Sequence, residues 1–343
     1  MAVLVTGSNG FLGSTLVERL VEGGTRGIRC LVREGSNRDR LDRLRSQYPE
    51  ADIEYCIGTL NSAEDPRKAV KGVDTVYHLA AALSGAPADM FLNTVVATKN
   101  LLEAIAAENP AVKFIHISSF SVYGVAHLPK GYTITEETPL EENPQKRDPY
   151  AFVKWYQEKL LLDYQRRLGF PLVILRPGVI YGPRGGAISG RVGLQLGGLF
   201  LHLGGNNLLP LSYVENCADA IITCARKAEP GVSIYNVHDD DLPTSRAYLK
   251  EYKKRVKKLR SIRIPYPFLQ LLSRGVEWYH HYSKGQLPAI FTPYKSANLW
   301  KGNRFDNSKL KSTGWQQRIP TREAMEMTMD YFSSIEKRNS LGK

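Results

Sequence analysis

The chain has 343 residues, of which 43% are hydrophobic, and a formal net charge of +12. This length fits one large globular domain or two closely joined ones, and no apolar run reaches the ~18–20 residues that a membrane span requires. The N-terminus enters a glycine motif without a basic leader or a cleavage site, so no signal peptide is expected. Four scattered cysteines without metal-binding spacing indicate reduced thiols, a cytoplasmic protein and no metal centre.

Strand and helix patterns alternate from the N-terminus to about residue 240. The stretch AVLVTGSNGFLGSTLVERLVEGG (2–24) predicts a strand, a glycine turn and a helix. Further short strands are predicted at residues 28–34, 73–81, 113–119, 171–182 and 232–239, with helical segments between them. Such alternation predicts a parallel sheet covered on both faces. The expected fold class is therefore α/β, a doubly wound parallel Rossmann sheet with a smaller, mainly C-terminal substrate lobe.

Two regions break this alternation. The first is rich in glycine and irregular, and the second holds helical patterns, several prolines and the aromatic stretch PYPFLQLLSRGVEWYHHY (265–282). The predicted division is a dinucleotide-binding domain of residues 1–182 and 214–239, a substrate-binding lobe of residues 183–213 and 240–330, and a frayed tail of residues 331–343.

Gly7, Gly10 and Gly13 form a GxxGxxG motif between the first predicted strand and the first predicted helix. Glycine permits a tight turn, lets the backbone approach a pyrophosphate and allows close packing of helix on strand. The helix N-terminus then offers free N–H groups to the anion. A glycine triplet alone is weak evidence for a dinucleotide site, but its place in a βαβ unit favours a dinucleotide cofactor.

Arg33 lies at the end of the second predicted strand, 20 residues after Gly13. A site specific for NAD usually has an acidic residue here to hold the ribose hydroxyls, whereas a guanidinium suits the 2′-phosphate of NADP, with Ser36 and Arg38 near enough to assist. Glu34 follows directly and would favour NAD. NADP is therefore the expected cofactor, and NAD is not excluded.

Tyr150 and Lys154 lie one helical turn apart in DPYAFVKWYQEKL. Asp148 suits the N-cap of this helix and Pro149 its first position, so both side chains are expected on the same side of its first turns. The chain has 18 Tyr, so the spacing alone is not diagnostic.

A tyrosine beside an ammonium group is suited to acid–base chemistry. The free phenol has a pKa of ~10, and an adjacent ammonium and an oxidised nicotinamide both favour its phenolate form. Tyr150 could then take a proton from a substrate alcohol or return it. A serine hydroxyl would hold the substrate oxygen, and Lys154 would hydrogen-bond the nicotinamide ribose.

Six motifs stand in a recognisable order: TGSNGFLG, YHLAA, ISSFSVYG, YAFVK, LRPGVIYGP and YVENCADA. In their order and approximate spacing the chain resembles the extended short-chain dehydrogenases/reductases, over nearly its full length and most strongly over residues 1–240. The resemblance implies Ser119, Tyr150 and Lys154 as catalytic residues, because the family's Ser or Thr lies four residues before the Tyr of VYG, here Tyr123. Ser118 is then expected to be structural.

The resemblance also implies a set of cofactor contacts, of which Pro177 and Val179 would flank the nicotinamide. The full set is Gly7, Asn9, Gly10, Phe11, Leu12, Gly13, Arg33, Leu60, Ala80, Ala81, Asn93, Tyr150, Lys154, Pro177 and Val179. Three positions depart from the family pattern. Thr59 replaces an Asp that often contacts adenine, Ala97 replaces a Gly, and Thr94 stands at the place of the supporting Asn, so that Asn93 lies one residue early.

The segment GGNNLLPLSYVENCADAI (204–221) lacks the R-D-F-like run that nucleotide-sugar epimerases and dehydratases usually carry before YVxN. This segment and residues 286–315 resemble instead the branch of 3β-hydroxysteroid and sterol-4-carboxylate 3-dehydrogenases. The expected function is an NAD(P)-dependent interconversion of a secondary alcohol and a ketone on a bulky, sterol-like small molecule. A nucleotide-sugar epimerase or dehydratase is the first alternative, and a non-catalytic dinucleotide-binding protein is the second.

Much of the positive charge lies in KEYKKRVKKLR (250–260). A solvated helix face is favoured here, and nucleic-acid binding is not expected, because no recognisable basic and aromatic module accompanies it. Attraction to anionic lipid or to a phosphorylated ligand stays open. For residues 265–282, binding of an apolar substrate, peripheral membrane contact and core packing are left open. A homodimer of the chain is also left open. His78 is expected to be a hydrogen-bonded core histidine.

Overall fold

The structure is a computed structural model that describes residues 2–284 and 291–341. Residues 285–290 and 342–343 include the start of the segment 286–315 and the end of the predicted tail, and both lie outside the described residues.

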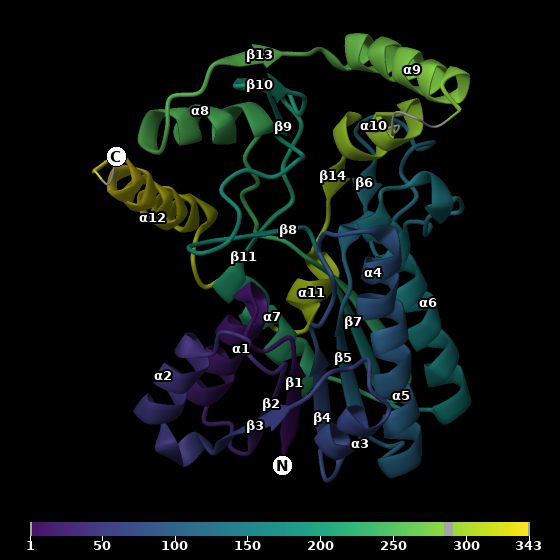
Figure 1. Ribbon diagram of the computed structural model, residues 1–343, viewed down its shortest axis with the longest axis vertical. Helices are drawn as coiled ribbons and strands as arrows, with labels where there is room; N and C mark the ends of the chain where they lie inside the picture. The colour runs from purple at the N-terminus through teal and green to yellow at the C-terminus, as the bar shows by residue number, and fades with distance from the viewer. Residues whose placement is uncertain (1, 285–290, 342–343) are drawn as a thin grey trace.

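A seven-stranded parallel sheet forms the lower half of the molecule in Figure 1. Its strands lie in the order β12 (Val232–Val237), β7 (Leu172–Pro177), β5 (Lys113–Ile117), β4 (Thr75–His78), β1 (Val3–Thr6), β2 (Ile28–Val32) and β3 (Ile53–Ile57). The chain order reverses between β4 and β1, and open α/β sheets bind their ligands at the carboxyl ends of the strands beside such a switch point. The predicted doubly wound Rossmann sheet is confirmed, although β3 was not among the predicted strands.

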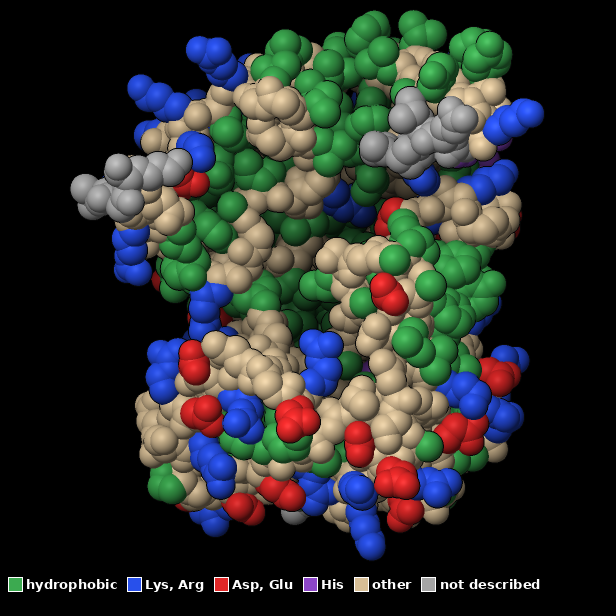
Figure 2. All heavy atoms as spheres, viewed as in Figure 1, with side chains coloured by type: hydrophobic (Ala, Val, Ile, Leu, Met, Phe, Trp, Pro, Cys, Tyr) green, Lys and Arg blue, Asp and Glu red, His purple; other side chains and the backbone are tan. Residues whose placement is uncertain are grey.

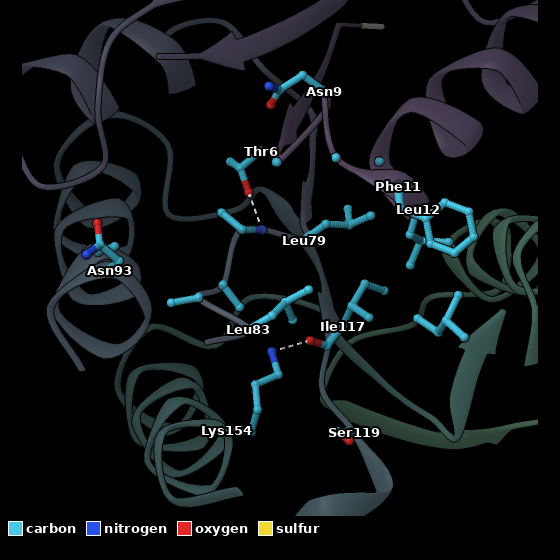
Figure 3. Close-up of a pocket in the computed structure, with 18 of the residues that line it drawn as sticks. Thr6, Asn9, Phe11, Leu12, Leu79, Leu83, Asn93, Ile117, Ser119 and Lys154 are labelled. Carbon is cyan, nitrogen blue, oxygen red and sulfur yellow. Dashed lines mark hydrogen bonds between the residues drawn. The ribbon is translucent and has the colours of Figure 1, made fainter. Parts of the chain in front are cut away.

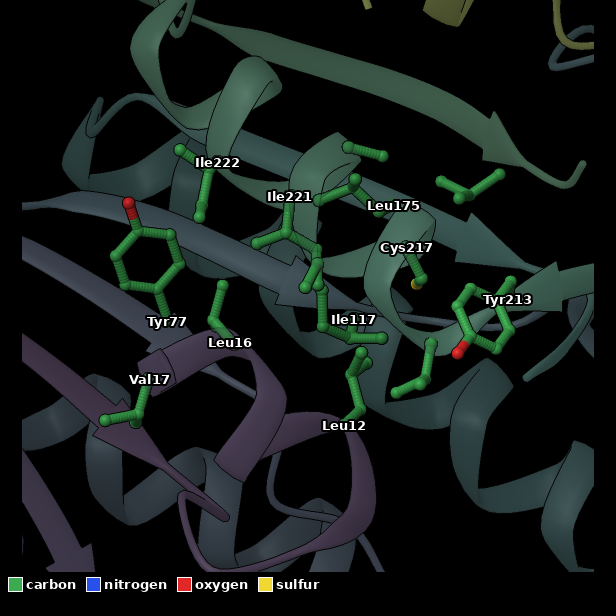
Figure 4. Close-up of a cluster of buried hydrophobic side chains, with 14 of the residues drawn as sticks. Leu12, Leu16, Val17, Tyr77, Ile117, Leu175, Tyr213, Cys217, Ile221 and Ile222 are labelled. Carbon is green, nitrogen blue, oxygen red and sulfur yellow. The ribbon is translucent and has the colours of Figure 1, made fainter. Parts of the chain in front are cut away.

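Helices cover both faces of this sheet. One face carries α1 (Phe11–Glu22), α2 (Asp39–Gln47) and α7 (Val214–Arg226), and the other carries α3 (Glu64–Val70), α5 (Ala97–Glu108) and α6 (Pro149–Leu168). Figure 4 shows the first interface, where Leu16 of α1, Ile221 of α7 and Ile117 of β5 belong to one cluster of buried side chains. Because both faces are covered, the central strands β1, β4, β5 and β7 are almost entirely buried, as expected for a parallel sheet.

Helix α6 begins and ends as its sequence predicts. The Asp148 carboxylate accepts a hydrogen bond of 3.0 Å from the backbone N–H of Ala151, and Pro149 occupies the first position. Gly169 closes the helix in the left-handed conformation, with a φ of +76°. These local contacts fix where the first turn of α6 lies, and therefore where Tyr150 is presented.

The upper half of the molecule is built from the two regions that break the alternation (Figure 1). A three-stranded sheet contains β9 (Gly193–Leu196), β10 (Leu199–His202) and β13 (Ser261–Arg263), beside α8 (Ser245–Arg255), α9 (Tyr266–Tyr282) and α10 (Pro293–Trp300). The stretch 183–213 is therefore not irregular throughout. Gly197 and Gly198 turn β9 into β10 with φ values of +51° and +83°, which suits the twist of a two-residue hairpin.

Short elements connect the two halves. Strand β8 (Val179–Tyr181) pairs with β11 (Leu211–Tyr213), and β6 (Thr133–Ile134) pairs with β14 (Arg304–Phe305). Helix α11 (Ser308–Ser312) then returns to the large sheet, where Leu310 and Trp315 join the core around α7.

The last described helix, α12 (Thr321–Leu341), contacts α8. The segment predicted as a frayed tail is helical up to residue 341, because Ala324 and Met329 anchor α12 in the core. The division of the chain into two domains stays a prediction. None of the helices in the described residues has the length and apolar character to pass through a bilayer.

Candidate functional site

The glycine turn lies at the carboxyl end of β1 and is closely packed against the end of β4. Gly7 has a φ of +69°, and a Cβ atom on it would lie 3.0 Å from the backbone nitrogen of Ala80. A Cβ atom on Gly13 would lie 2.0 Å from the carbonyl oxygen of Gly7. The turn therefore accepts no side chain at these positions, and it leaves the N-terminus of α1 open to an anion.

A cavity of about 940 Å³ begins at this turn and extends along the carboxyl ends of the strands. Figure 2 shows the hollow between the lower half and the lobe, and Figure 3 shows part of the cavity wall. All but one of the predicted site residues line it: Gly7, Asn9, Gly10, Phe11, Leu12, Gly13, Arg33, Leu60, Ala80, Ala81, Asn93, Ser119, Tyr150, Lys154 and Pro177.

Val179 is the predicted residue that does not line the cavity. Its neighbours Gly178 and Ile180 do, and successive residues of a strand face opposite ways. The backbone N–H of Val179 donates a hydrogen bond of 2.6 Å to the carbonyl of Pro210. This contact sets β8 against β11, so that Ile180 is the side chain that faces the cavity.

Asn93 reaches the cavity from a π-helical turn. Helix α4 (Pro87–Phe91) continues into the π-helix Leu92–Val96 before α5 begins. Such a turn contains one residue more than an α-helical turn, which offsets the one-residue displacement of Asn93. The amide of Asn93 accepts a hydrogen bond of 3.0 Å from Asn61, whereas Thr94 is buried and its hydroxyl accepts one from the backbone N–H of Ala82.

Tyr150 and Ser119 meet at the far end of the cavity from the glycine turn. Burial raises the pKa of Tyr150 above its usual value of 10.0, and a side-chain hydrogen bond with Ser119 acts in the opposite direction. The Ser119 hydroxyl also accepts a hydrogen bond of 3.1 Å from the backbone N–H of Ser121, as the cap of a short 3₁₀ turn. The serine is thereby held by the backbone next to the phenol.

Lys154 is part of the same cavity wall and is only 3% exposed. Its Nζ atom donates to the carbonyl oxygen of Ile117 at 2.7 Å, drawn in Figure 3, and to Oε1 of Gln157 at 2.6 Å. Burial lowers its pKa to about 7, against the opposing attraction of Glu158. An ammonium group has three N–H donors, and these two contacts use two of them.

A buried network stands behind these residues. His78 bonds to the hydroxyls of Thr6 and Thr98 at 2.8 Å each, and Gln157 also donates to Thr98. Burial lowers the pKa of His78 to about 3, so its imidazole is neutral. The prediction of a hydrogen-bonded core histidine is confirmed, and Gln157 connects this histidine to Lys154.

Glu158 belongs to a second buried network on the next turn of α6. It forms an ion pair with Arg176 of β7 and accepts a hydrogen bond of 2.6 Å from the Ser118 hydroxyl. Arg176 in turn donates to the hydroxyl of Tyr123 at 3.0 Å. Ser118 thus forms a structural hydrogen bond with Glu158, and Ser119 is the serine that forms a hydrogen bond with Tyr150.

The cavity edge at the end of β2 contains Arg33. Glu34 is exposed and is not part of the cavity wall. Arg38 is not part of the cavity wall, and its guanidinium carbon lies 5.2 Å from the ring centre of Tyr55.

Sequence reasoning missed several residues of the wall, among them Asn61 and Arg184. Arg184 has a φ of +74°, and a Cβ atom on the following Gly185 would lie 2.8 Å from the ring of Phe11. The loop therefore lies on the start of α1. Its only signal in the sequence is the run GPRGG (182–186) directly after a predicted strand.

Comparisons with known proteins agree with this geometry. The model of the NAD dependent epimerase/dehydratase family matches residues 3–237. The chain belongs to this family. Members similar to the chain include dehydrogenases, epimerases and dehydratases, so the chain is an enzyme of the extended short-chain dehydrogenase/reductase type. Family membership supports a nicotinamide dinucleotide as its cofactor.

Two curated members show the range of this family. A 3-beta-hydroxysteroid dehydrogenase of Mycolicibacterium neoaurum is 26% identical, and the match covers 97% of this chain and 92% of that protein. The trifunctional UDP-glucose 4,6-dehydratase, epimerase and reductase RHM1 of Arabidopsis thaliana is 24% identical. That match covers 96% of this chain and 47% of the plant protein, so this chain spans about half its length.

Solved structures share the fold over almost the whole chain. The crystal structure of gox2253 has a TM-score of 0.78 at 23% identity and covers 97% of this chain and 98% of its own. The UDP-glucose 4-epimerase of Bifidobacterium longum in complex with NAD+ and UDP has a TM-score of 0.73 at 20% identity, with 98% and 99% covered. At these identities the likeness concerns the fold.

Proposed function

We propose that this family member is an NAD(P)-dependent oxidoreductase that interconverts a secondary alcohol and a ketone on a bulky, largely apolar substrate. The observation that carries this proposal is the meeting of Ser119, Tyr150 and Lys154 on one wall of the cavity whose other end is the glycine turn. When bound, the dinucleotide supplies the hydride acceptor or donor. The turn at Gly7 and Gly13 fits its pyrophosphate, because no Cβ atom stands in the way.

Tyr150 moves the proton in this proposal. In the oxidative direction its phenolate takes the proton of the substrate hydroxyl, and in the reductive direction its hydroxyl returns it. Ser119 holds the substrate oxygen, because its hydroxyl is already placed by the Ser121 N–H and lies beside the phenol. Burial alone disfavours the phenolate, so nearby positive charge is required to form it.

Lys154 supplies that charge and holds the cofactor. Ile117 and Gln157 fix its Nζ atom, and the third N–H donor is available for a ribose hydroxyl of the nicotinamide nucleotide. An ammonium close to Tyr150 also lowers the pKa of the phenol. Gln157 is a positioning residue, since its Oε1 atom holds the Nζ atom of Lys154.

NADP is the proposed form of the cofactor. Arg33 lines the cavity and Glu34 does not, and a guanidinium makes two parallel charge-assisted bonds to a phosphate. The cytoplasm stays the proposed location. The four cysteines Cys30, Cys56, Cys217 and Cys224 are free thiols in the structure, which supports a reducing compartment.

The proposed substrate class rests on the segment before the YVEN motif. Leu209 and Leu211 are buried there, and Pro210 lies between them. This segment therefore offers no guanidinium to a nucleotide diphosphate. A relative of nearly full length, from M. neoaurum, is named as a 3-beta-hydroxysteroid dehydrogenase, which supports a cyclic apolar alcohol.

The test combines a substrate screen with a matched pair of variants. Hydroxysteroids and UDP- or dTDP-sugars are offered with NADP or NAD, and nicotinamide absorbance is followed. We expect net turnover with an apolar cyclic alcohol, and a loss of about 10²–10⁴-fold in Tyr150→Phe. Tyr156→Phe, an exposed tyrosine on the same helix, is expected to keep its activity. A fully active Tyr150→Phe enzyme would contradict the role of Tyr150 in proton transfer.

A nucleotide-sugar epimerase or dehydratase is the second candidate. Its support is the likeness to RHM1. Such an enzyme converts its substrate through a closed cycle. Conversion of a nucleotide sugar without net change in nicotinamide absorbance would therefore decide for it.

A further inference from the structure

Helix α9 presents a continuous apolar stripe to solvent. Six large side chains of this helix are between 45% and 73% exposed: Phe268, Leu271, Leu272, Trp278, Tyr279 and Tyr282. They lie at positions i, i+3, i+4, i+10, i+11 and i+14, with Gly275 at i+7, which places them along one face. Figure 2 shows hydrophobic side chains gathered across the top of the molecule, over α9.

The opposite face of α9 already serves the fold. Leu269 packs with Leu203 and Trp300, and the hydroxyl of Ser273 bonds to that of Ser296 in α10 at 2.7 Å. Helix α9 is thus apolar on two sides although only one of them has a protein partner within the described residues. A surface helix of a globular protein normally has one apolar face, so the exposed stripe requires another explanation.

Basic residues precede the stripe in the chain and accompany it on α9. Residues 250–284 contain ten Lys and Arg against two acidic residues. Two of these basic residues, Arg255 and Lys257, form ion pairs with acidic residues of α12, and the others add to the positive charge of this part of the lobe. Arg263 and Arg274 are exposed, and neither is ion-paired in the part of the chain that the structure describes. The apolar side chain of Ile262, 52% exposed, lies in β13, which directly precedes α9 in the chain.

We propose that α9 and the adjoining basic segment form a peripheral docking surface for an anionic phospholipid bilayer. An interfacial helix has Trp, Phe and Leu on one face, basic residues around it, and lies in the plane of the headgroups. Trp278, Tyr279 and Tyr282 have the amphipathic rings that accumulate at the level of the headgroups. Charge complementarity favours lipid over a second copy of this chain, because two copies would bring the same positive segments together.

The first experiment measures sedimentation of the full chain with vesicles in low salt. One set is phosphatidylcholine alone, and the other contains equal parts of phosphatidylcholine and phosphatidylglycerol. We expect binding to the anionic set and little to the neutral set. Brominated acyl chains should quench part of the tryptophan fluorescence, because Trp278, the one exposed tryptophan of the four, enters the acyl boundary.

Variants separate the apolar and electrostatic contributions. Leu271→Glu should weaken binding to anionic vesicles by roughly tenfold or more, and Arg274→Glu by roughly fivefold or more. Val232→Glu is the matched control, since Val232 is 40% exposed at the start of β12, in the other half of the molecule. It should bind as the wild type does.

Three results would overturn the proposal. One is wild-type protein that stays in solution with anionic vesicles and shows no quenching of its tryptophan fluorescence. Another is Leu271→Glu binding as tightly as Val232→Glu. The third is a protein that does not bind vesicles and is a dimer in sedimentation velocity, with Leu271→Glu dissociating the dimer. A second copy of the chain would then cover the stripe.

Discussion

Apolar residues are buried in the sheet half of this molecule but largely exposed in helix α9 of the lobe. All six residues of β7 are buried, because helices cover both faces of the sheet. In α9, only Leu269 and Ser273 are buried, and large apolar side chains face solvent. Apolar residues are therefore a sign of burial only where the topology supplies cover on that side. Where it does not, an apolar surface is more informative about partners than about the core.

Ion pairs also differ between the two halves in how far they are buried. Arg176 and Glu158 are almost fully buried inside the sheet half, and Ser118 completes the hydrogen bonding of Glu158. Arg255 and Asp330 join α8 to α12 in the lobe, with Asp330 67% exposed. Water can replace either partner of the second pair, but not of the first.

The largest expected effect comes from breaking the buried pair. Glu158→Ala leaves the Arg176 charge buried without its partner, and we expect a loss of about 3–5 kcal/mol in the free energy of unfolding. Asp330→Ala in the lobe should cost about 0–1 kcal/mol. Urea unfolding of both variants measures the difference. Equal losses would show that the two pairs have similar surroundings.

Buried Lys154 makes the stability of the sheet half depend on pH. Its pKa is about 7 when folded and ~10.4 when unfolded, so the unfolded chain binds the additional proton between these values. Stability then rises with pH in this window. From pH 7 to pH 9 the wild type should gain about 1–2 kcal/mol over Lys154→Met.

The control for this prediction is Lys254→Met, since Lys254 is exposed in α8. Its free energy of unfolding should follow that of the wild type across the same pH range, without cofactor. If the free energies of unfolding of Lys154→Met and of the wild type change equally with pH, the pKa of Lys154 is not lowered by folding.

A smaller effect is expected at the cavity edge. Arg33→Ala should raise the dissociation constant of NADP roughly tenfold, which corresponds to about 1.4 kcal/mol, and leave that of NAD nearly unchanged. Arg38→Ala is the matched control, because its guanidinium lies over Tyr55. Titration of both dinucleotides by calorimetry measures the ratio. Unchanged NADP affinity in Arg33→Ala would remove the support for NADP.

The smallest effect is expected in the lobe, at Gly275. A Cβ atom here meets no atom within 4 Å, and alanine is a better helix former than glycine by about 1 kcal/mol. Gly275→Ala should therefore raise the melting temperature, measured without vesicles. At Gly13 the same substitution meets the Gly7 carbonyl and should destabilise. A lower melting temperature for Gly275→Ala would indicate that this face of α9 is covered.

Much of the sheet half follows from short-range chemistry. The glycine turn, the cap of α6 by Asp148 and the alternation of strands with helices each depend on neighbours in the sequence. Strand β3 was missed because only Ile53 of its five residues is buried, which leaves IEYCI without a clear pattern. The hairpin β9–β10 was missed because Gly197–Gly198 suits a loop as well as a turn between two strands.

The sequence by itself determined the parallel sheet and the segments that bring Ser119, Tyr150 and Lys154 to its strand ends, because periodicity and capping act over a few residues. Tertiary structure decided which side chains face the cavity. The pairing of β8 with β11 presents Ile180 instead of Val179, and a π-helical turn presents Asn93 instead of Thr94. It also decided that α9 is covered on one side only, since α10 packs against just one face. Such choices depend on contacts between segments far apart in the chain, which no local pattern contains.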